Sequence, residues 1–142
     1  MIFLAALALS LAVQLIRPAR TNPPTDPART LRARVAVPAD VSQILDRACK
    51  DCHTHDTAWP WYSNVAPVSW LLIDHVNHGR RHVNFSDWAS YSASDAAKHM
   101  KDACKIVRDG EMPMTSYVWM HDEAKLSQQD IDRICAWTEG KP

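Results

Sequence analysis

Apolar residues recur every three or four positions in the segments that start near Asp40, Pro67, Ser94 and Ser127. This spacing places the apolar side chains on one face of a helix. No stretch of the chain alternates apolar and polar residues with a period of two, which is the pattern of a half-buried strand. The pattern therefore predicts a small all-α domain.

The first two of these helices are expected to have clear starts. Asp40 can cap a helix whose inward stripe includes both Cys49 and Cys52. Pro67 suits the first position of the second helix, because proline lacks the amide hydrogen that this position leaves unbonded. Gly79 is expected to end that helix, since glycine often follows the last turn.

The last two helices are also expected to have clear ends. The third runs over about residues 94–110 and stops at Gly110, which tolerates a left-handed cap. The fourth starts at Ser127, with Asp130 at the third helical position completing a capping box. Leu126 and Ile131 stand on either side of this start and are expected to form a hydrophobic staple.

The first sixteen residues carry no charge, which predicts a membrane or export segment. As a helix they would extend roughly 24 Å, somewhat less than a hydrocarbon core of about 30 Å. The run lacks a basic start and a small-residue cleavage site, so an uncleaved anchor over residues 1–17 is favoured over a signal peptide. Arg17 and Arg20 follow it, where the positive-inside rule disfavours export, so a missing basic leader before Met1 is expected.

A proline-rich segment, residues 18–38, separates this anchor from the helical part, residues 39–142. Prolines at four of its first ten positions favour extended backbone, which predicts a semi-rigid spacer that holds the domain off the membrane. The 142 residues suffice for one domain, and 16 basic residues balance 16 acidic ones. Without a Lys/Arg run, a nucleic-acid partner is not expected.

The motif C-K-D-C-H contains Cys49, Cys52 and His53. Structural zinc sites usually take ligands in two close pairs, but Cys104 and Cys135 lie far apart on separate helices. A thioredoxin-type motif would follow a strand in a βαβ unit, and no strand is predicted. Covalent haem explains every position: the two thiols add to the haem vinyl groups, and the adjacent histidine reaches the iron.

Such a haem needs a second axial ligand or an open site. Met112, in D-G-E-M-P-M after the third helix, is the first candidate, because a thioether on a short loop beside proline can approach the iron opposite His53. Met114 and His75 are the alternatives. For any methionine the competing explanation is core packing, and for His75 it is a hydrogen-bonded core residue.

The aromatic group in W-P-W-Y-S follows the haem motif. Trp59, Trp61 and Tyr62 are expected either to pack against the porphyrin or to fill the core, and the two roles are compatible. His121 is expected to hydrogen-bond a haem propionate or the backbone rather than the iron.

Cys104 and Cys135 both fall on inward stripes of their helices. Outside the cytoplasm such thiols pair if their Cα atoms approach within about 7 Å, so a disulfide is expected, with two free buried thiols as the alternative. A bond closing about thirty residues would stabilise the fold by roughly 3 to 4 kcal/mol. It would also hold the Met112 loop against the last helix.

The chain resembles the bacterial haem-binding domain family of short, membrane-anchored proteins with a single C-x-x-C-H. The resemblance rests on these stretches: Q-L-I-R-P-A-R-T-N-P-P, C-K-D-C-H, W-P-W-Y-S-N-V-A-P-V-S-W, H-V-N-H-G-R-R-H-V-N-F-S-D-W, G-E-M-P-M and H-D-E-A-K-L-S. It implies one covalent haem c on Cys49 and Cys52, His53 as proximal ligand and Met112 as distal ligand. It also implies a cytochrome-c-like helical domain on the periplasmic face of the bacterial inner membrane.

Three functions are compatible with these features. The leading hypothesis is a membrane-anchored monohaem c-type cytochrome that passes single electrons between periplasmic or membrane redox proteins. No nucleophile or acid–base constellation indicates an enzyme. A haem sensor with a displaceable distal ligand is the second hypothesis, and a disulfide-stabilised structural domain without haem is the third.

Overall fold

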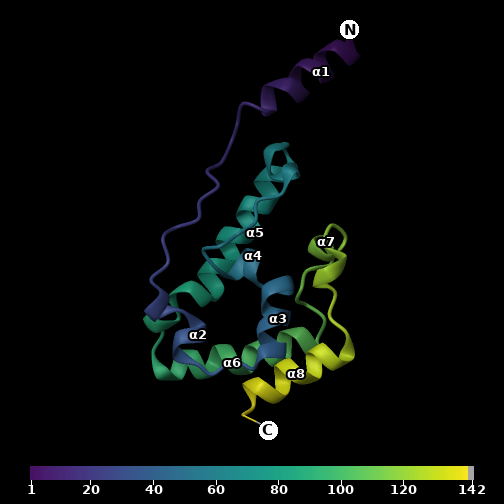
Figure 1. Ribbon diagram of the computed structural model, residues 1–142. Helices are drawn as coiled ribbons and strands as arrows, with labels where there is room; N and C mark the ends of the chain where they lie inside the picture. Colours follow the sequence, from purple (N-terminus) through teal and green to yellow (C-terminus); the bar gives the residue numbers. More distant parts are fainter. Residues whose placement is uncertain (141–142) are drawn as a thin grey trace.

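The described part of the computed structural model, residues 1–140, consists of helices and connecting segments and contains no strand. Figure 1 shows α1 standing apart from the other helices at the N-terminal end. The predicted all-helical class is confirmed for these residues. The elements in chain order are α1 (Ile2–Val13), η1 (Pro27–Arg29), α2 (Leu31–Arg34), α3 (Ala39–Ala48), α4 (Lys50–His53), η2 (Trp61–Asn64), α5 (Val68–His82), η3 (Phe85–Ser90), α6 (Ala93–Arg108), α7 (Thr115–Val118), η4 (Asp122–Ala124) and α8 (Gln128–Thr138).

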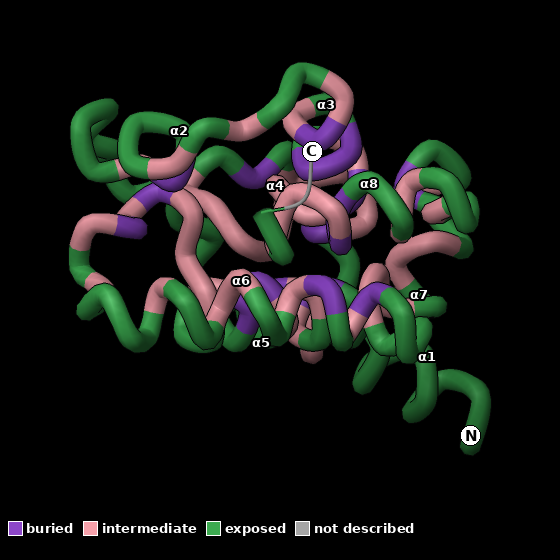
Figure 2. The backbone as a smooth tube through the Cα atoms, turned by 90° about the horizontal axis from the view of Figure 1, so that it is seen from below, coloured by how far each residue is buried: buried purple, intermediate pink, exposed green. Residues whose placement is uncertain are grey.

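Two groups of buried side chains form the core, and α3 contributes to both. Ile44 packs with residues of α6 and α8, including Ile134. Val41 and Leu45, on another part of α3, pack with Leu31 and Trp88. Figure 2 shows that α1 contains no buried position, whereas buried positions occur along the helices of the domain. Because α3 is packed into both groups, its C-terminal end, which leads into the C-K-D-C-H motif, is fixed relative to the core.

Three expected helix boundaries are wrong, one of them because Pro67 is the N-cap of α5 (Val68–His82) rather than its first residue. Pro38 caps α3, and Asp40 lies in its first turn, where its carboxylate accepts from the amide of Val41. The α5 helix continues past Gly79 to His82, since Gly79 is buried inside the helix rather than placed after its last turn. Glycine alone therefore did not mark the end of this helix.

The ends of α6 and α8 follow the expected chemistry more closely. Ser92 caps α6, and Gly110 beyond its end has a φ of 72°, as predicted for a left-handed cap. Ser127 caps α8, and Asp130 completes the capping box. Leu126 and Ile131 both pack against the core group of Ile44. The start of α8 is thus encoded locally.

The α1 helix presents large apolar side chains to its surroundings and buries none of them. Within residues 1–140, no helix combines the length and hydropathy needed to cross a bilayer.

The segment after α1 lies against the domain; we call residues 14–26 the strap. The side chain of Gln14 makes two hydrogen bonds to the backbone of Ala66, donating at 3.1 Å and accepting at 2.9 Å. The indole of Trp70 donates to the carbonyl of Ile16 at 2.8 Å. The end of α1 is therefore held beside the start of α5, as Figure 1 allows the reader to follow.

Arg80 of α5 holds the other end of the strap. Its guanidinium donates to the carbonyls of Thr21 and Thr54, both at 2.7 Å, and to Asn22 and Thr57. The strap, which includes the first nine residues of the expected spacer, is thus hydrogen-bonded to the domain near both of its ends.

Candidate functional site

The C-K-D-C-H motif forms a helical turn of its own. The backbone leaves helical geometry at Cys49, with φ −125° and ψ −31°, and α4 then covers Lys50–His53. The amides of Cys52 and His53 both donate to the carbonyl of Cys49, at 3.3 and 3.0 Å. The sequence pattern placed both cysteines on one continuous helix, so the break at Cys49 is a correction. Its consequence is that the three motif residues are joined in a single turn.

His53 is held in the form that binds a metal through Nε2. Its Nδ1 lies 3.0 Å from the carbonyl oxygen of Val83, and because a carbonyl can only accept, Nδ1 carries the proton. Burial lowers the pKa of His53, against the opposing effect of the Val83 and Gly79 carbonyls, so the ring stays neutral near pH 7. A neutral imidazole protonated at Nδ1 keeps the Nε2 lone pair for a metal ion.

The two motif thiols are protonated. Burial, and then the charge of the neighbouring thiol, raises the pKa of Cys49 to about 12. Burial, and then Asp51, raises the pKa of Cys52 to about 11. Reactive dithiol motifs depend on a lowered thiol pKa, so this environment does not favour thioredoxin-type chemistry.

Gly79 lets α5 contact the motif directly. A Cβ placed on Gly79 would lie 2.6 Å from the carbonyl oxygen of Cys52 and 3.1 Å from its Cβ. Real Cβ contacts are essentially never this short to backbone atoms. Only glycine therefore permits this distance between α5 and α4.

A pair of tyrosines connects the motif with the segment around α7. The hydroxyl of Tyr117 donates to the carboxylate of Asp51 at 2.8 Å, and burial followed by this bond raises the pKa of Tyr117. The Tyr62 hydroxyl lies 2.7 Å from Nε2 of His121, whose ring stacks on Tyr117 with centroids 4.3 Å apart. These contacts bring Tyr62 together with Tyr117 and His121, which are distant from it in sequence, beside Asp51 of the motif.

Arg47 fixes the chain that follows α7. Its guanidinium donates to the carbonyls of Glu123 and Lys125, at 2.6 and 3.0 Å, and pairs with Asp130 at 2.8 Å. Since Arg47 lies two residues before Cys49, the last turn of α3 anchors this segment beside the motif.

The model of a haem-binding domain matches residues 8–140. The chain belongs to the haem-binding domain family. Comparison with curated proteins and with solved structures finds no match. Membership implies that the protein binds haem.

The residues of this haem-binding domain fit that cofactor by their chemistry. Covalent attachment of haem would need two thiols three positions apart and an imidazole with a free lone pair, and the turn formed by Cys49 and α4 contains all three. A cavity of about 380 Å³ lies beside the turn and is lined by Lys50 and Thr54, but not by Cys49, Cys52 or His53. Its wall includes apolar Leu45 and Phe85, Lys50 from the motif itself, and His55. The Nδ1 atom of His55 is buried without a hydrogen-bond partner among the described residues.

The predicted distal candidates lie on different elements. Met112 is partly buried and packs against the core group of Ile44, and Met114 is the residue that precedes α7. The loop that carries both continues into Tyr117, which bonds to the motif. His75 is half-buried in the middle of α5. The loop that carries Met112 is thus linked to the C-K-D-C-H motif through the hydrogen bond between Tyr117 and Asp51.

The predicted aromatic residues have unequal environments. Trp59 is half-buried, and Trp61 exposes 74% of its surface. Tyr62 is half-buried and bonds His121, the histidine that was expected to bond a haem propionate or the backbone. Of the three, only Tyr62 has a polar group, its hydroxyl, for which a side-chain hydrogen bond is found among the described residues, and the partner is His121.

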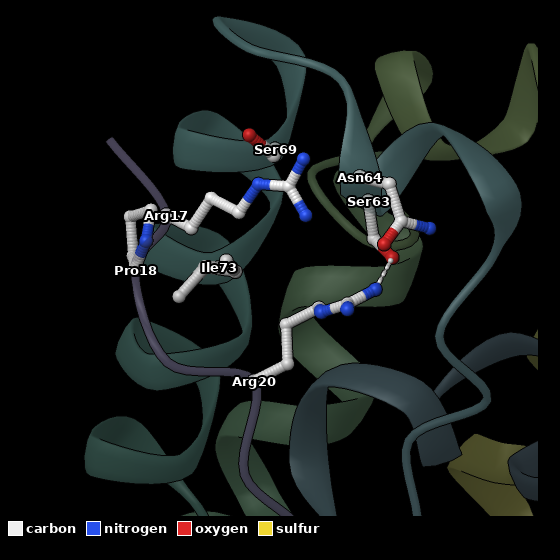
Figure 3. Close-up of a pocket in the computed structure, with 7 residues that line it drawn as sticks. All are labelled: Arg17, Pro18, Arg20, Ser63, Asn64, Ser69 and Ile73. Atoms are coloured by element: carbon white, nitrogen blue, oxygen red, sulfur yellow. Dashed lines mark hydrogen bonds between the residues drawn. The ribbon is translucent and has the colours of Figure 1, made fainter. Parts of the chain in front are cut away.

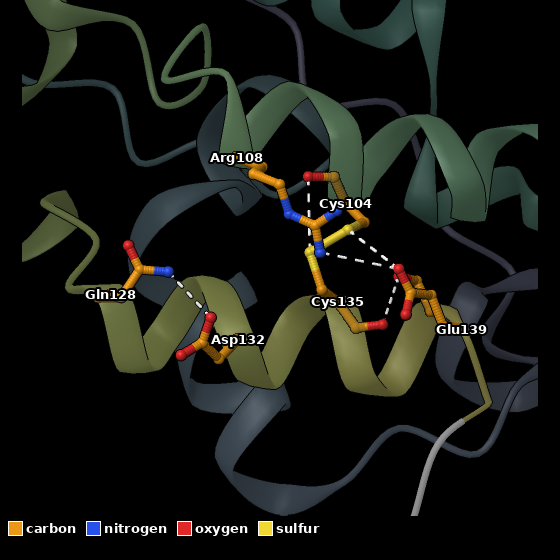
Figure 4. The surroundings of a disulfide bond; sticks show 7 residues. Cys104, Arg108, Gln128, Asp132, Cys135 and Glu139 are labelled. Atoms are coloured by element: carbon orange, nitrogen blue, oxygen red, sulfur yellow. Dashed lines mark hydrogen bonds and ion pairs between the residues drawn. A yellow bond between two sulfur atoms is a disulfide. The ribbon is translucent and has the colours of Figure 1, made fainter.

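The predicted disulfide between Cys104 and Cys135 is confirmed in the structure, where their Cα atoms lie 4.7 Å apart. Figure 4 shows that it joins α6 to α8 beside a pair of charged residues, Arg108 and Glu139, 3.7 Å apart. Met112 packs against the same core group as the two half-cystines. The disulfide therefore braces one end of the loop and the Tyr117 bond braces the other.

Sequence reasoning missed Gly79, Asp51 and Tyr117 as parts of this site. Gly79 resembled a helix stop, because glycine has the same local propensity in both roles. Asp51 is inside the motif, at a position that C-x-x-C-H leaves open. Nothing in the sequence pairs Asp51 with Tyr117, 66 positions away.

Proposed function

We propose that this haem-binding domain attaches one haem c covalently through Cys49 and Cys52 and transfers single electrons between redox proteins. The observation that carries the proposal is the geometry of His53. Its Nδ1 proton is committed to the Val83 carbonyl, which orients the ring and leaves Nε2 for iron beside the two thiols. Bound haem would supply the one-electron couple.

Met112 is the proposed distal ligand, and a fixed distal ligand favours electron transfer over ligand sensing. The loop that carries Met112 is held by core packing on one side and by the Tyr117–Asp51 bond on the other. A loop fixed at both ends resists the displacement that a sensor requires. Soft thioether ligation also raises the reduction potential of haem iron.

The proposed location is the periplasmic face of the bacterial inner membrane, with α1 as the membrane attachment. Two observations support it: the Cys104–Cys135 disulfide suits an oxidising compartment, and the side chains of α1 are apolar and exposed. Redox proteins are the proposed partners.

The test is the absorption spectrum of the full chain produced in cells that mature c-type cytochromes. Covalent haem must survive acid–acetone extraction, and Cys49→Ser with Cys52→Ser must abolish retention. Loss of all haem from the natural sequence would refute attachment.

The distal ligand is tested on the same protein. Met112→Ala should remove the weak far-red band of methionine-ligated ferric haem, whereas Met114→Ala, a matched change on the same loop, should retain it. A ferrous spectrum that does not change when carbon monoxide is added supports electron transfer. Rapid carbon monoxide binding by the natural sequence would instead support a sensor.

A further inference from the structure

Two arginines of the strap point into a cavity that lies apart from the haem motif. Figure 3 shows the guanidinium of Arg17 directed toward Ser69 and that of Arg20 directed toward Ser63 and Asn64. The cavity has a volume of about 210 Å³. The lining residues are Arg17, Pro18, Arg20, Ser63, Asn64, Ser69 and Ile73.

The lining is suited to an oxyanion. It combines two guanidinium groups with two hydroxyls and an amide, and it contains no carboxylate. The Ser63 hydroxyl donates to the carbonyl of Pro60 and the Asn64 amide donates to the carbonyl of Trp61, so the two guanidinium groups are the main donors left for an anion. Arg20 donates to the Ser63 hydroxyl at 3.0 Å, and Arg17 donates through Nε to the carbonyl of Gln14 at 3.1 Å. Among residues 1–140 neither guanidinium forms an ion pair, and each group has five N–H donors in all. Planar guanidinium donors match the oxygens of a phosphate group.

The position of the cavity indicates where that phosphate comes from. The Gln14–Ala66 bonds hold the end of apolar α1 at the start of α5, and the two arginines follow Gln14 by three and six residues. With α1 in lipid hydrocarbon, these side chains lie at the depth of the lipid headgroups. Basic residues beside a membrane segment attract anionic lipids.

We propose that this cavity binds the phosphate of an anionic phospholipid headgroup and so fixes the domain against the membrane surface. The inference rests on the proposed attachment of α1 to the membrane, and it is independent of haem. It gives the strap a binding role in addition to the spacer role expected for residues 18–38.

The experiment measures partition of the full-length holoprotein into two kinds of vesicle, pure phosphatidylcholine and phosphatidylcholine mixed with phosphatidylglycerol. Arg17→Gln with Arg20→Gln should weaken binding to the anionic vesicles by about fivefold per arginine, roughly 25-fold in total, and leave binding to neutral vesicles unchanged. The matched control, Arg34→Gln with Arg81→Gln, removes the same charge from two exposed positions outside the cavity and should have a much smaller effect.

The outcomes distinguish a failure of the headgroup-site proposal from a failure of the proposed membrane attachment through α1. Equal binding of the natural and Arg17/Arg20 proteins to anionic vesicles, or an equal loss in the Arg34/Arg81 control, would overturn the headgroup site while leaving the anchor intact. Failure of the natural protein to bind neutral vesicles would overturn both. In detergent solution, short-chain phosphatidylglycerol should protect the protein from thermal unfolding. Equal protection by inorganic phosphate would overturn the lipid as the source.

Discussion

Replacing Gly79 by alanine tests whether α5 packs against the haem motif as closely as the structure shows. Inside a solvent-exposed helix this change stabilises a protein by about 1 kcal/mol, because alanine is the better helix former. Here the new methyl group would lie 2.6 Å from the Cys52 carbonyl oxygen, so α4 and α5 must separate by several tenths of an ångström. Overpacking of this kind costs about 1–3 kcal/mol, and a rigid backbone obstacle favours the upper half of that range. The net expectation is a loss of about 1–2 kcal/mol.

The assay is urea unfolding of the holoprotein, combined with the yield of covalent haem. Asn77→Ala, at an exposed position of the same helix, is the matched control and should gain about 0.5 kcal/mol from helix propensity alone. Gly79→Ala should also lower the haem yield, since Cys52 must move. A Gly79→Ala protein that is about 1 kcal/mol more stable than the natural one, with a normal haem yield, would refute the close α4–α5 contact.

Three further changes test the disulfide, the tyrosine bond and the thiol environment. Replacing Cys104 and Cys135 by serine removes a disulfide between residues 31 positions apart and should lower the free energy of unfolding, measured with denaturant, by about 3–4 kcal/mol. A decrease of less than about 1 kcal/mol would contradict the bracing role of the disulfide. Tyr117→Phe removes the hydroxyl that donates to Asp51, so it should lower the free energy of unfolding by about 1–2 kcal/mol and weaken the far-red band of the ferric haem. If neither quantity changes, this hydrogen bond does not hold the Met112 loop in place. In haem-free protein, burial raises the pKa of Cys49 from 9.0 to about 12, so its reaction with a thiol reagent near pH 8 should be about a thousandfold slower than in the unfolded chain and should rise about tenfold per pH unit. Equal rates in the folded and unfolded chains would contradict the burial.

The sequence was most informative where the relevant interactions are local. The start of α8 needs only Ser127 and Asp130, which are three residues apart, so the capping box could be predicted from the pattern alone. The C-K-D-C-H motif is equally local, because its two thiols and its histidine lie within five consecutive residues and can be recognised without knowing the fold. The Cys104–Cys135 pairing was predictable because both residues fall on inward stripes of helices.

Apart from the Cys104–Cys135 disulfide, the contacts between distant segments were decided by the tertiary structure. Gly79 has the same local properties at a helix end and at a close helix contact, and only the approach of the Cys52 carbonyl distinguishes the two. Residues 18–26 of the strap were expected to belong to a spacer because prolines favour extended backbone, but proline content does not specify what an extended chain lies against. The strap's bonds to Ala66 and Arg80 join residues that lie 52 and 59 positions apart in the sequence. Local sequence therefore determined the chemistry of the haem motif, and long-range packing determined which segments surround it.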